Sequence, residues 1–176
     1  AINGHNLVVA APGVLSNDSD QDNDPLTAVL IGSPAHGTVT LNPNGSFTYT
    51  STPGYSGADS FTYAANDGVV NGNIVTVSIT VLPQIRPNPA AAPSVLVAGE
   101  GTSLSSAPAG GSGTYTAFAW SGPNGFASSL RNPGSVTMPA AGVFEFSLTV
   151  TDGLGYSDTG KVTIFDFYAD WCAPCR

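Results

Sequence analysis

Residues 38–50 read Thr-Val-Thr-Leu-Asn-Pro-Asn-Gly-Ser-Phe-Thr-Tyr-Thr, and this stretch indicates the fold of the chain. Apolar and polar residues alternate on both sides of the Asn-Gly pair at 44–45, as they do in strands with one buried face. Asn-Gly favours the positive φ angles of hairpin turns. We therefore expect strands at 38–41 and 46–50 that pair in an antiparallel hairpin.

The same alternation continues on both sides of this hairpin, from residue 7 to residue 82. Short runs rich in Val, Ile, Thr, Phe and Tyr are separated by Gly, Pro and Asn, which is typical of strands divided by turns. Further strands are expected at residues 26–31, 60–64 and 74–81, with turns near 32–34 and 66–68. Residues 1–82 are therefore predicted to form one β-sandwich.

The composition of the 176-residue chain favours an all-β fold. It contains 21 Gly and 14 Pro, and only 9% of its residues are charged, so there is little material for surface helices. A hydrophobic content of 41% excludes a disordered linker, and the length suffices for two domains. No apolar run is long enough to cross a bilayer, so membrane insertion is not expected.

The net charge of −8 excludes a nucleic-acid partner, because phosphate binding requires lysine and arginine. Such residues occur only at Arg86, Arg131, Lys161 and Arg176. A surface poor in lysine and rich in serine and threonine is similar to that of secreted bacterial proteins. These features predict an extracellular location at the bacterial cell surface.

Residues 83–94 contain four prolines and no alternation, so we expect an extended proline-rich linker that joins no sheet. Beyond it the strand-and-turn pattern returns, with strands expected at 94–97, 114–120, 134–138, 143–150 and 160–164. Residues 95–167 are predicted to form a second β-sandwich, followed by a tail at 168–176. The predicted fold class is all-β, with two tandem immunoglobulin-like or cadherin-like β-sandwiches joined by the linker.

Several motifs of the first half occur in the order and spacing of one family. They are Ala-Pro-Gly-Val-Leu-Ser-Asn-Asp at 11–18, Asp-Pro-Leu-Thr at 24–27, His-Gly-Thr-Val at 36–39, Asn-Gly-Ser-Phe-Thr-Tyr at 44–49, Gly-Ala-Asp-Ser-Phe-Thr-Tyr at 57–63 and Asn-Asp-Gly at 66–68. Together they resemble a bacterial cadherin-like repeat of large surface adhesins over residues 7–82. Family members carry a longer, acidic first strand than residues 1–6. The resemblance therefore implies an incomplete sheet edge, whose unpaired backbone groups another chain could satisfy.

Residues 142–153, Gly-Val-Phe-Glu-Phe-Ser-Leu-Thr-Val-Thr-Asp-Gly, and the upstream Trp120 resemble a PKD-type immunoglobulin-like domain. This resemblance covers residues 95–165 and implies that Trp120 packs between two sheets. It also implies that Asp152 and Gly153 form the turn before the last strand. The Gly-Asp-Gly signature of PKD repeats is absent, and Ser-Gly-Pro-Asn-Gly stands in its place at 121–125.

Four of the 12 acidic residues alternate in one short loop, as Asp18, Asp20, Asp22 and Asp24. Crowded carboxylates repel one another unless they fan out into water or surround a cation, and oxygen ligands suit calcium. An EF-hand is excluded, because its twelfth position is Val29 instead of a glutamate. The hypothesis is a cadherin-like calcium site, with Asp67 as a fifth ligand if its turn lies at the same end. The alternative is a solvated turn in which Asp and Asn side chains bond their own backbone.

The two cysteines, Cys172 and Cys175, lie in residues 165–176, Phe-Asp-Phe-Tyr-Ala-Asp-Trp-Cys-Ala-Pro-Cys-Arg, which resemble the active-site segment of thioredoxin. The resemblance implies that Cys172 is the attacking thiol and Cys175 the resolving one. It covers about a dozen residues of a fold that needs about a hundred, so we expect no catalysis from this chain. Two explanations stay open: a following thioredoxin-like domain, and a disulfide that fixes this end of the chain. Haem attachment is excluded, because Arg176 stands where a histidine is required.

These observations predict a non-enzymatic structural or adhesive module of a bacterial surface protein. Its expected partners are copies of itself or other surface proteins, and carbohydrate is a further candidate. One hypothesis is a filament in which residues 162–168 add as a strand to the exposed edge of a neighbour. The alternative, which we favour for residues 161–167, is that they form the last strand of their own sandwich. Two other interpretations are the non-catalytic arm of a thioredoxin-like redox protein and a carbohydrate-binding accessory module.

Overall fold

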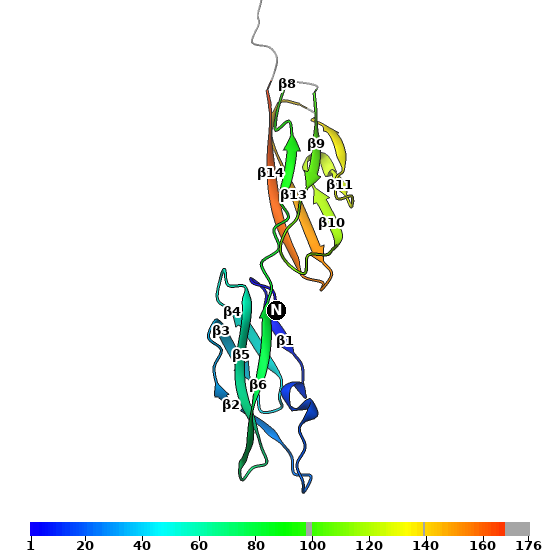
Figure 1. Ribbon diagram of the computed structural model, residues 1–176. Helices are drawn as coiled ribbons and strands as arrows, with labels where there is room; N and C mark the ends of the chain where they lie inside the picture. Colours follow the sequence, from blue (N-terminus) through cyan, green and yellow to red (C-terminus); the bar gives the residue numbers. More distant parts are fainter. Residues whose placement is uncertain (98–99, 139, 168–176) are drawn as a thin grey trace, which may run out of the picture. The chain divides into compact units, whose positions relative to one another are not determined.

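The computed structural model describes residues 1–97, 100–138 and 140–167 of the chain (Figure 1). The described elements are strands and two short 3-10 helices, and they form two compact units that divide between Gln84 and Ile85. Each unit has two sheets with a hydrophobic core between them. The predicted all-β fold with two tandem β-sandwiches is therefore confirmed.

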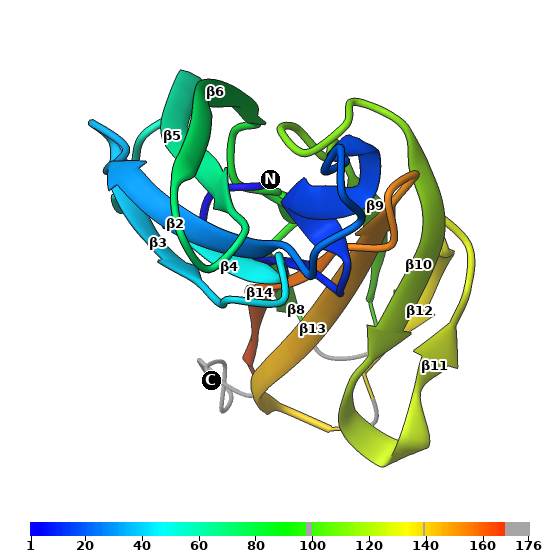
Figure 2. The same cartoon turned by 90° about the horizontal axis from the view of Figure 1, so that it is seen from below.

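The first unit contains β1 (Leu7–Val9), η1 (Gly13–Asn17), β2 (Thr27–Gly32), β3 (Gly37–Leu41), β4 (Phe47–Ser51), β5 (Gly57–Asn66) and β6 (Asn71–Val81). One of its sheets has the strand order β1-β4-β3 and the other the order β2-β5-β6. The strand pairs within these two sheets are antiparallel. In Figure 2, β3 and β4 lie on one side of the unit, and β5 and β6 lie on the other.

Aromatic side chains at alternate strand positions fill the core of the first unit. Phe47 and Tyr49 come from β4, and Phe61 and Tyr63 come from β5. The rings of Phe47 and Phe61 meet edge to face, with centroids 5.2 Å apart. The two-residue period of the sequence thus separates a buried face from an exposed one, and aromatic contacts join the two sheets.

The predicted hairpin at residues 38–50 is formed by β3 and β4, in which Thr38 pairs with Thr50. Gly45 in its turn has a φ of 83°. The turn contacts η1 here, because the Gly45 carbonyl accepts the N–H of Val14 at 3.0 Å. A Cβ at Gly45 would collide with the carbonyl of Pro12. Both the positive φ and the crossing backbone therefore require glycine at this position.

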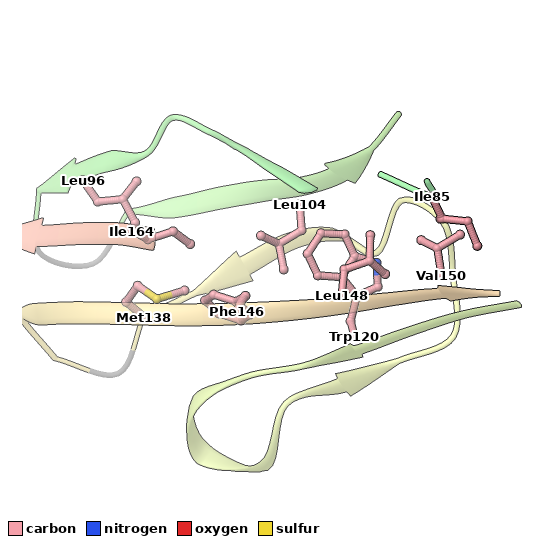
Figure 3. Packing of buried hydrophobic residues seen from close by; sticks show 9 residues of the cluster. All are labelled: Ile85, Leu96, Leu104, Trp120, Met138, Phe146, Leu148, Val150 and Ile164. Carbon is pink, nitrogen blue, oxygen red and sulfur yellow. The ribbon is translucent and has the colours of Figure 1, made fainter. Parts of the chain in front are cut away.

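The second unit contains β7 (Pro89–Ala92), β8 (Val95–Val97), β9 (Gly101–Ser106), β10 (Tyr115–Ser121), η2 (Pro123–Gly125), β11 (Ala127–Ser128), β12 (Gly134–Thr137), β13 (Gly142–Asp152) and β14 (Ser157–Phe167). Its sheets have the strand orders β11-β10-β13-β14-β8 and β12-β9-β7. Figure 3 shows the core between them, where Trp120 is 2% exposed. The tryptophan that the PKD resemblance places between two sheets therefore does lie in the core.

The prediction that residues 83–94 join no sheet is wrong for Arg86 and for Pro89–Ala92. Ile85 is 1% exposed and belongs to the core of the second unit. Arg86 forms an isolated bridge with Ala109, and Pro89–Ala92 pairs with β9 as strand β7. β7 lies at the edge of its sheet, where a proline that lacks an N–H is tolerated because only one side of the strand needs partners.

Residues 161–167 lie within β14, as the favoured alternative predicts. β14 pairs antiparallel with β13 up to Asp166, and Phe165–Phe167 pair in parallel with β8. This end of β14 is thus held on both sides within its own sandwich. Phe165 and Asp166 therefore have no free edge to donate to a neighbour, whereas Phe167 is paired on the β8 side alone. Residue 168 lies outside the described part of the chain.

Candidate functional site

The acidic loop that follows η1 is tied to the opposite sheet by one tyrosine. Tyr63 of β5 is 2% exposed, and its hydroxyl lies 2.7 Å from the carbonyl oxygen of Val14 and 2.8 Å from Oδ2 of Asp18. Burial, and after it the hydrogen bond to Asp18, raises the pKa of Tyr63 to about 12. The hydroxyl is therefore neutral near pH 7 and links the start of the loop to the core.

Replacing Tyr63 by phenylalanine is expected to lower the free energy of unfolding of the first unit by about 1–2 kcal/mol, because buried acceptors lose their donor. Amide hydrogens of residues 13–26 should exchange faster, since the loop loses its link to β5. Hydrogen exchange measured by mass spectrometry tests this. The matched control is Tyr55→Phe, which removes a hydroxyl that bonds Ala58 instead and should leave the exchange of this loop unchanged. Equal exchange in both variants would contradict the anchoring role.

Asp20 and Asp67 bond the backbone of their own turns. Oδ1 of Asp20 accepts the N–H groups of the residues two and four positions later, at 2.8 and 3.0 Å. Oδ1 of Asp67 accepts the N–H groups of Val69 and Val70, both at 2.7 Å. The bonds from Val70 and Val69 lower the pKa of Asp67. Both side chains therefore act as turn caps of the kind that Asp and Asn commonly provide.

Two adjoining cavities gather most of the predicted calcium ligands. Asp18, Asp20 and Asp67 line one cavity of about 390 Å³, so the turn that carries Asp67 lies beside the acidic loop. Asp24 lines a second cavity, of about 540 Å³, together with Asp18 and Asp20. Asp22 lines neither of these two cavities.

The aspartates do not form a metal centre in this conformation. Within residues 1–97, 100–138 and 140–167, no group of three His, Cys, Asp or Glu side chains could hold a metal ion. Calcium takes about six to eight oxygen ligands, whereas three of these carboxylates bond donors of the chain itself. The observed contacts fit the capped, solvated turn. Calcium binding stays a prediction for Asp18, Asp20, Asp22, Asp24 and Asp67.

Cys172 and Cys175 lie outside the described residues, so their pairing and their role stay predictions. The described part of that segment ends in β14 with an unusual carboxylate. Asp166 is 3% exposed, and neither of its side-chain oxygens has a hydrogen-bond partner among the residues that the structure describes. An ionised carboxylate buried without a partner destabilises the folded state.

Replacing Asp166 by leucine is therefore expected to stabilise the second unit by about 1–3 kcal/mol, because it removes an unpaired polar group from an apolar environment. Urea unfolding followed by tryptophan fluorescence measures the change. Asp158→Leu is the control on the same strand, at a position where the carboxylate accepts the N–H of Thr159. A loss of stability in Asp166→Leu would show that this carboxylate has a stabilising partner.

The sequence does not predict two buried carboxylates, one in each unit, that hold turns in place by accepting backbone N–H groups. Asp59 of β5 is 8% exposed and Asp152 of β13 is 1% exposed. The sequence places Asp152 in a turn, but it does not predict that the carboxylate of Asp152 is buried. A signal was available, because both residues continue an alternating inward series, at 59, 61 and 63 and at 148, 150 and 152. A polar residue in such a series indicates a buried acceptor with several donors.

An apolar groove runs along β6 beside the acidic cavity. It has a volume of about 380 Å³, and η1, β6 and the core residues Phe47 and Tyr63 contribute to its walls. Asn17 and Val75 line both this groove and the acidic cavity, so the two spaces adjoin. The groove was not predicted, because it depends on which elements lie beside β6.

The fold and this site define tandem immunoglobulin-like β-sandwiches, a class of domain that is typically non-catalytic. Residues 1–83 match the family model described as bacterial cadherin-like domain. The resemblance predicted for this half is therefore confirmed. Bacterial cadherin-like domains occur in surface or extracellular proteins, and cadherin-like domains mediate homophilic or surface interactions and commonly bind calcium.

Several solved structures resemble the chain in fold. The PKD1 domain of the Vibrio cholerae metalloprotease PrtV is 25% identical, with 47% of this chain and 91% of that domain covered and a TM-score of 0.36. An endo-fucoidan hydrolase of glycoside hydrolase family 107 is 20% identical over 96% of this chain, with a TM-score of 0.40, and the chain spans 27% of its length. Protocadherin gammaB7 domains EC3-6 are 16% identical, with coverages of 85% and 41% and a TM-score of 0.32. A search of curated proteins gave no match.

None of the helices in the described part of the chain has the length and apolar character needed to cross a membrane.

Proposed function

We propose that the chain is an extracellular structural or adhesive module of a bacterial surface protein. The observation that carries this proposal is the match of residues 1–83 to the bacterial cadherin-like family. The second sandwich begins directly after the first, at Ile85. The work of such a module is mechanical. The close-packed interior of each sandwich makes it a stiff building block, and its surface is available for contact with partners.

The test is the location and accessibility of the protein in its own bacterium. An antibody raised against the purified chain should label intact cells, and protease added outside the cells should remove the signal. Labelling that appears only after the cells are permeabilised would overturn the proposal. This experiment does not depend on how the chain assembles.

Strand addition is the proposed mode of assembly, and copies of the chain or other surface proteins are its proposed partners. Support comes from β6, a long strand at the edge of its sheet in the first unit. Exposed edges of this kind pair readily with other chains unless they are protected. Electron microscopy and sedimentation velocity over a range of concentrations should show linear assemblies. A chain that stays monomeric at high concentration would contradict self-assembly.

Calcium binding at the acidic loop is tested by thermal unfolding with and without a chelator. An ion that binds only the native state stabilises it; at ten times a dissociation constant of about 1 mM the gain is about 1.4 kcal/mol. We therefore expect the melting midpoint of the first unit to rise by about 6–11 °C in about 10 mM calcium, and to rise less in an Asp18→Asn, Asp20→Asn double variant. An unchanged midpoint would assign these side chains to turn capping alone.

The spacing of Cys172 and Cys175 favours a second candidate function, the non-catalytic arm of a thioredoxin-like redox protein. An insulin-reduction assay tests whether the chain has thiol-redox activity of its own. The structural proposal expects no reduction above the background rate of the added dithiol. Turnover that is lost in Cys172→Ser would overturn it in favour of the redox function.

A further inference from the structure

Strand β6 has an unpaired outer edge over most of its length. It is the last strand in the order β2-β5-β6, so β5 occupies only one of its sides. On the other side, the described contacts come from the start of the chain: the amino group of Ala1 donates to the Thr80 carbonyl at 3.1 Å, and Ile2 forms a parallel bridge with Leu82. In the described part of the chain, no strand pairs with this side of residues 71–79. Their outward backbone groups are therefore available to another strand.

The apolar groove lies along this unpaired edge. Its floor includes Phe47 and Tyr63 of the core, which are 6% and 2% exposed. Val75 and Val77 of β6 line it with half-buried side chains, and Val14 of η1 lines it with a buried one. The two valines stand two positions apart, so they lie on the same face of the strand and point inward together. A strand laid along β6 would place every second side chain into this groove.

One end of the groove is acidic. Asn17 and Val75 connect it to the cavity lined by Asp18, Asp20 and Asp67, which also includes Asn73. The apolar part lies beside residues 75–77, and the acidic part lies beside the start of β6. The first unit contains six aspartates and no lysine or arginine in residues 1–84, so no cation of its own neutralises this end.

We propose that the groove between β6 and η1 binds an extended segment of another protein chain as an added strand. The segment has apolar side chains at alternate positions, which enter the groove beside Val75 and Val77. A lysine or arginine at one end meets Asp18, Asp20 and Asp67. Backbone pairing with β6 supplies affinity, and the apolar positions and the cation supply specificity.

This inference deepens the proposed function, because it names the acceptor site for strand addition. The donor is not residues 165–166 of a second copy, since both sides of that stretch are occupied by β13 and β8. The match to the groove is instead one of shape and charge: an unpaired edge, an apolar floor and an uncompensated acidic end. These features select an extended cationic and apolar peptide over an acidic one.

The experiment uses the full chain and two labelled peptides, Lys-Thr-Val-Thr-Val-Thr-Val and its reverse sequence, which cover both strand directions. Fluorescence anisotropy measures binding, and hydrogen exchange locates it. We expect one peptide to bind and to slow amide exchange in residues 71–79 but not in β2, the other edge of the same sheet. A peptide N-methylated at alternate residues cannot complete the ladder and should not bind. Absence of binding by both peptides, or protection of β2 alone, would overturn the proposal.

Substitutions then separate the two parts of the site. Val77→Lys places a charge in the apolar groove and should abolish binding of both charged and neutral peptides. The matched control is Val143→Lys in the second unit, where the valine is 66% exposed, and binding should be unchanged. Asparagine at 18, 20 and 67 keeps an oxygen acceptor at each position but removes the charge. This triple variant should bind the lysine peptide about tenfold more weakly at low salt, and its affinity for the Lys→Gln version of the peptide should be unchanged.

The outcome is independent of the cellular test of function. If intact cells are labelled but the peptide does not slow amide exchange in residues 71–79, the adhesive role is supported and the groove is not its acceptor site. If the peptide slows amide exchange in residues 71–79 but intact cells are not labelled, the groove is a strand-binding site and the proposed function is overturned. Circular dichroism of each variant confirms that it retains its β-sheet content before binding is measured.

Discussion

Asp152→Ala is expected to lower the free energy of unfolding of the second unit by about 3–5 kcal/mol, a large part of the stability of a typical domain. Oδ1 of Asp152 accepts the N–H groups of Leu154 and Tyr156 at 2.9 and 3.0 Å, and Oδ2 accepts the N–H of Ser112 at 2.9 Å. One buried carboxylate thus holds the turn between β13 and β14 and also the loop before β10. Removing it leaves several donors without an acceptor, which costs more than the bonds themselves contribute.

Asp152→Asn is the graded control for this prediction. Asparagine keeps one oxygen for Leu154 and Tyr156 and replaces the other by an amide that cannot accept from Ser112. Its expected cost is about 1–2 kcal/mol. Urea unfolding followed by tryptophan fluorescence reports on the second unit, because both tryptophans of the chain follow residue 84. A loss below about 1 kcal/mol in the alanine variant would show that water replaces the carboxylate.

Asp59→Ala is expected to destabilise the first unit by a similar amount, about 3–5 kcal/mol. Oδ1 of Asp59 accepts the N–H groups of Ala35 and Ser60 at 3.0 and 2.9 Å. Oδ2 accepts the N–H of His36 at 3.1 Å and the hydroxyl of Tyr49 at 2.7 Å. The carboxylate therefore joins β5, β4 and the segment between β2 and β3. Hydrogen exchange of residues 28–66 measures the loss, since residues 1–84 contain no tryptophan.

The pH dependence of the first unit tests the same contacts. Burial raises the pKa of Asp59, but the hydrogen bonds led by that from Tyr49 outweigh it and hold the pKa below the usual value. The contribution of Asp59 is therefore complete above its unfolded pKa of about 3.9 and is lost as the pH falls through the folded pKa. Asp59→Asn should reduce this acid sensitivity. The matched variant Tyr49→Phe should lower the free energy of unfolding by only about 1–2 kcal/mol, because it removes one of the four donors. Equal losses of stability in Tyr49→Phe and Asp59→Ala would contradict a carboxylate that is shared by four donors.

Local regularities of the chain predicted the hairpin and the two sandwiches. These features follow from short-range physics, because alternation fixes which side of a strand is apolar and Asn-Gly fixes the turn. The position of Trp120 between two sheets was instead implied by the PKD resemblance. The linker prediction failed because strand pairing depends on residues that are distant in the sequence. Pro89 has no N–H to give to a ladder, but whether it needs one depends on its neighbours, and β7 lies at an edge.

The sequence by itself determined that the chain is all-β, that it forms two units, and that carboxylates cluster at one loop of the first unit. Only the tertiary structure decided which groups those carboxylates meet. Asp18 bonds Tyr63, 45 residues away, and Asp59 collects donors from three segments. The open edge of β6 and the groove beside it also depend on long-range packing. Hydrophobic periodicity acts between near neighbours in the chain, whereas an acceptor, a cavity or a free edge is defined by residues that folding brings together.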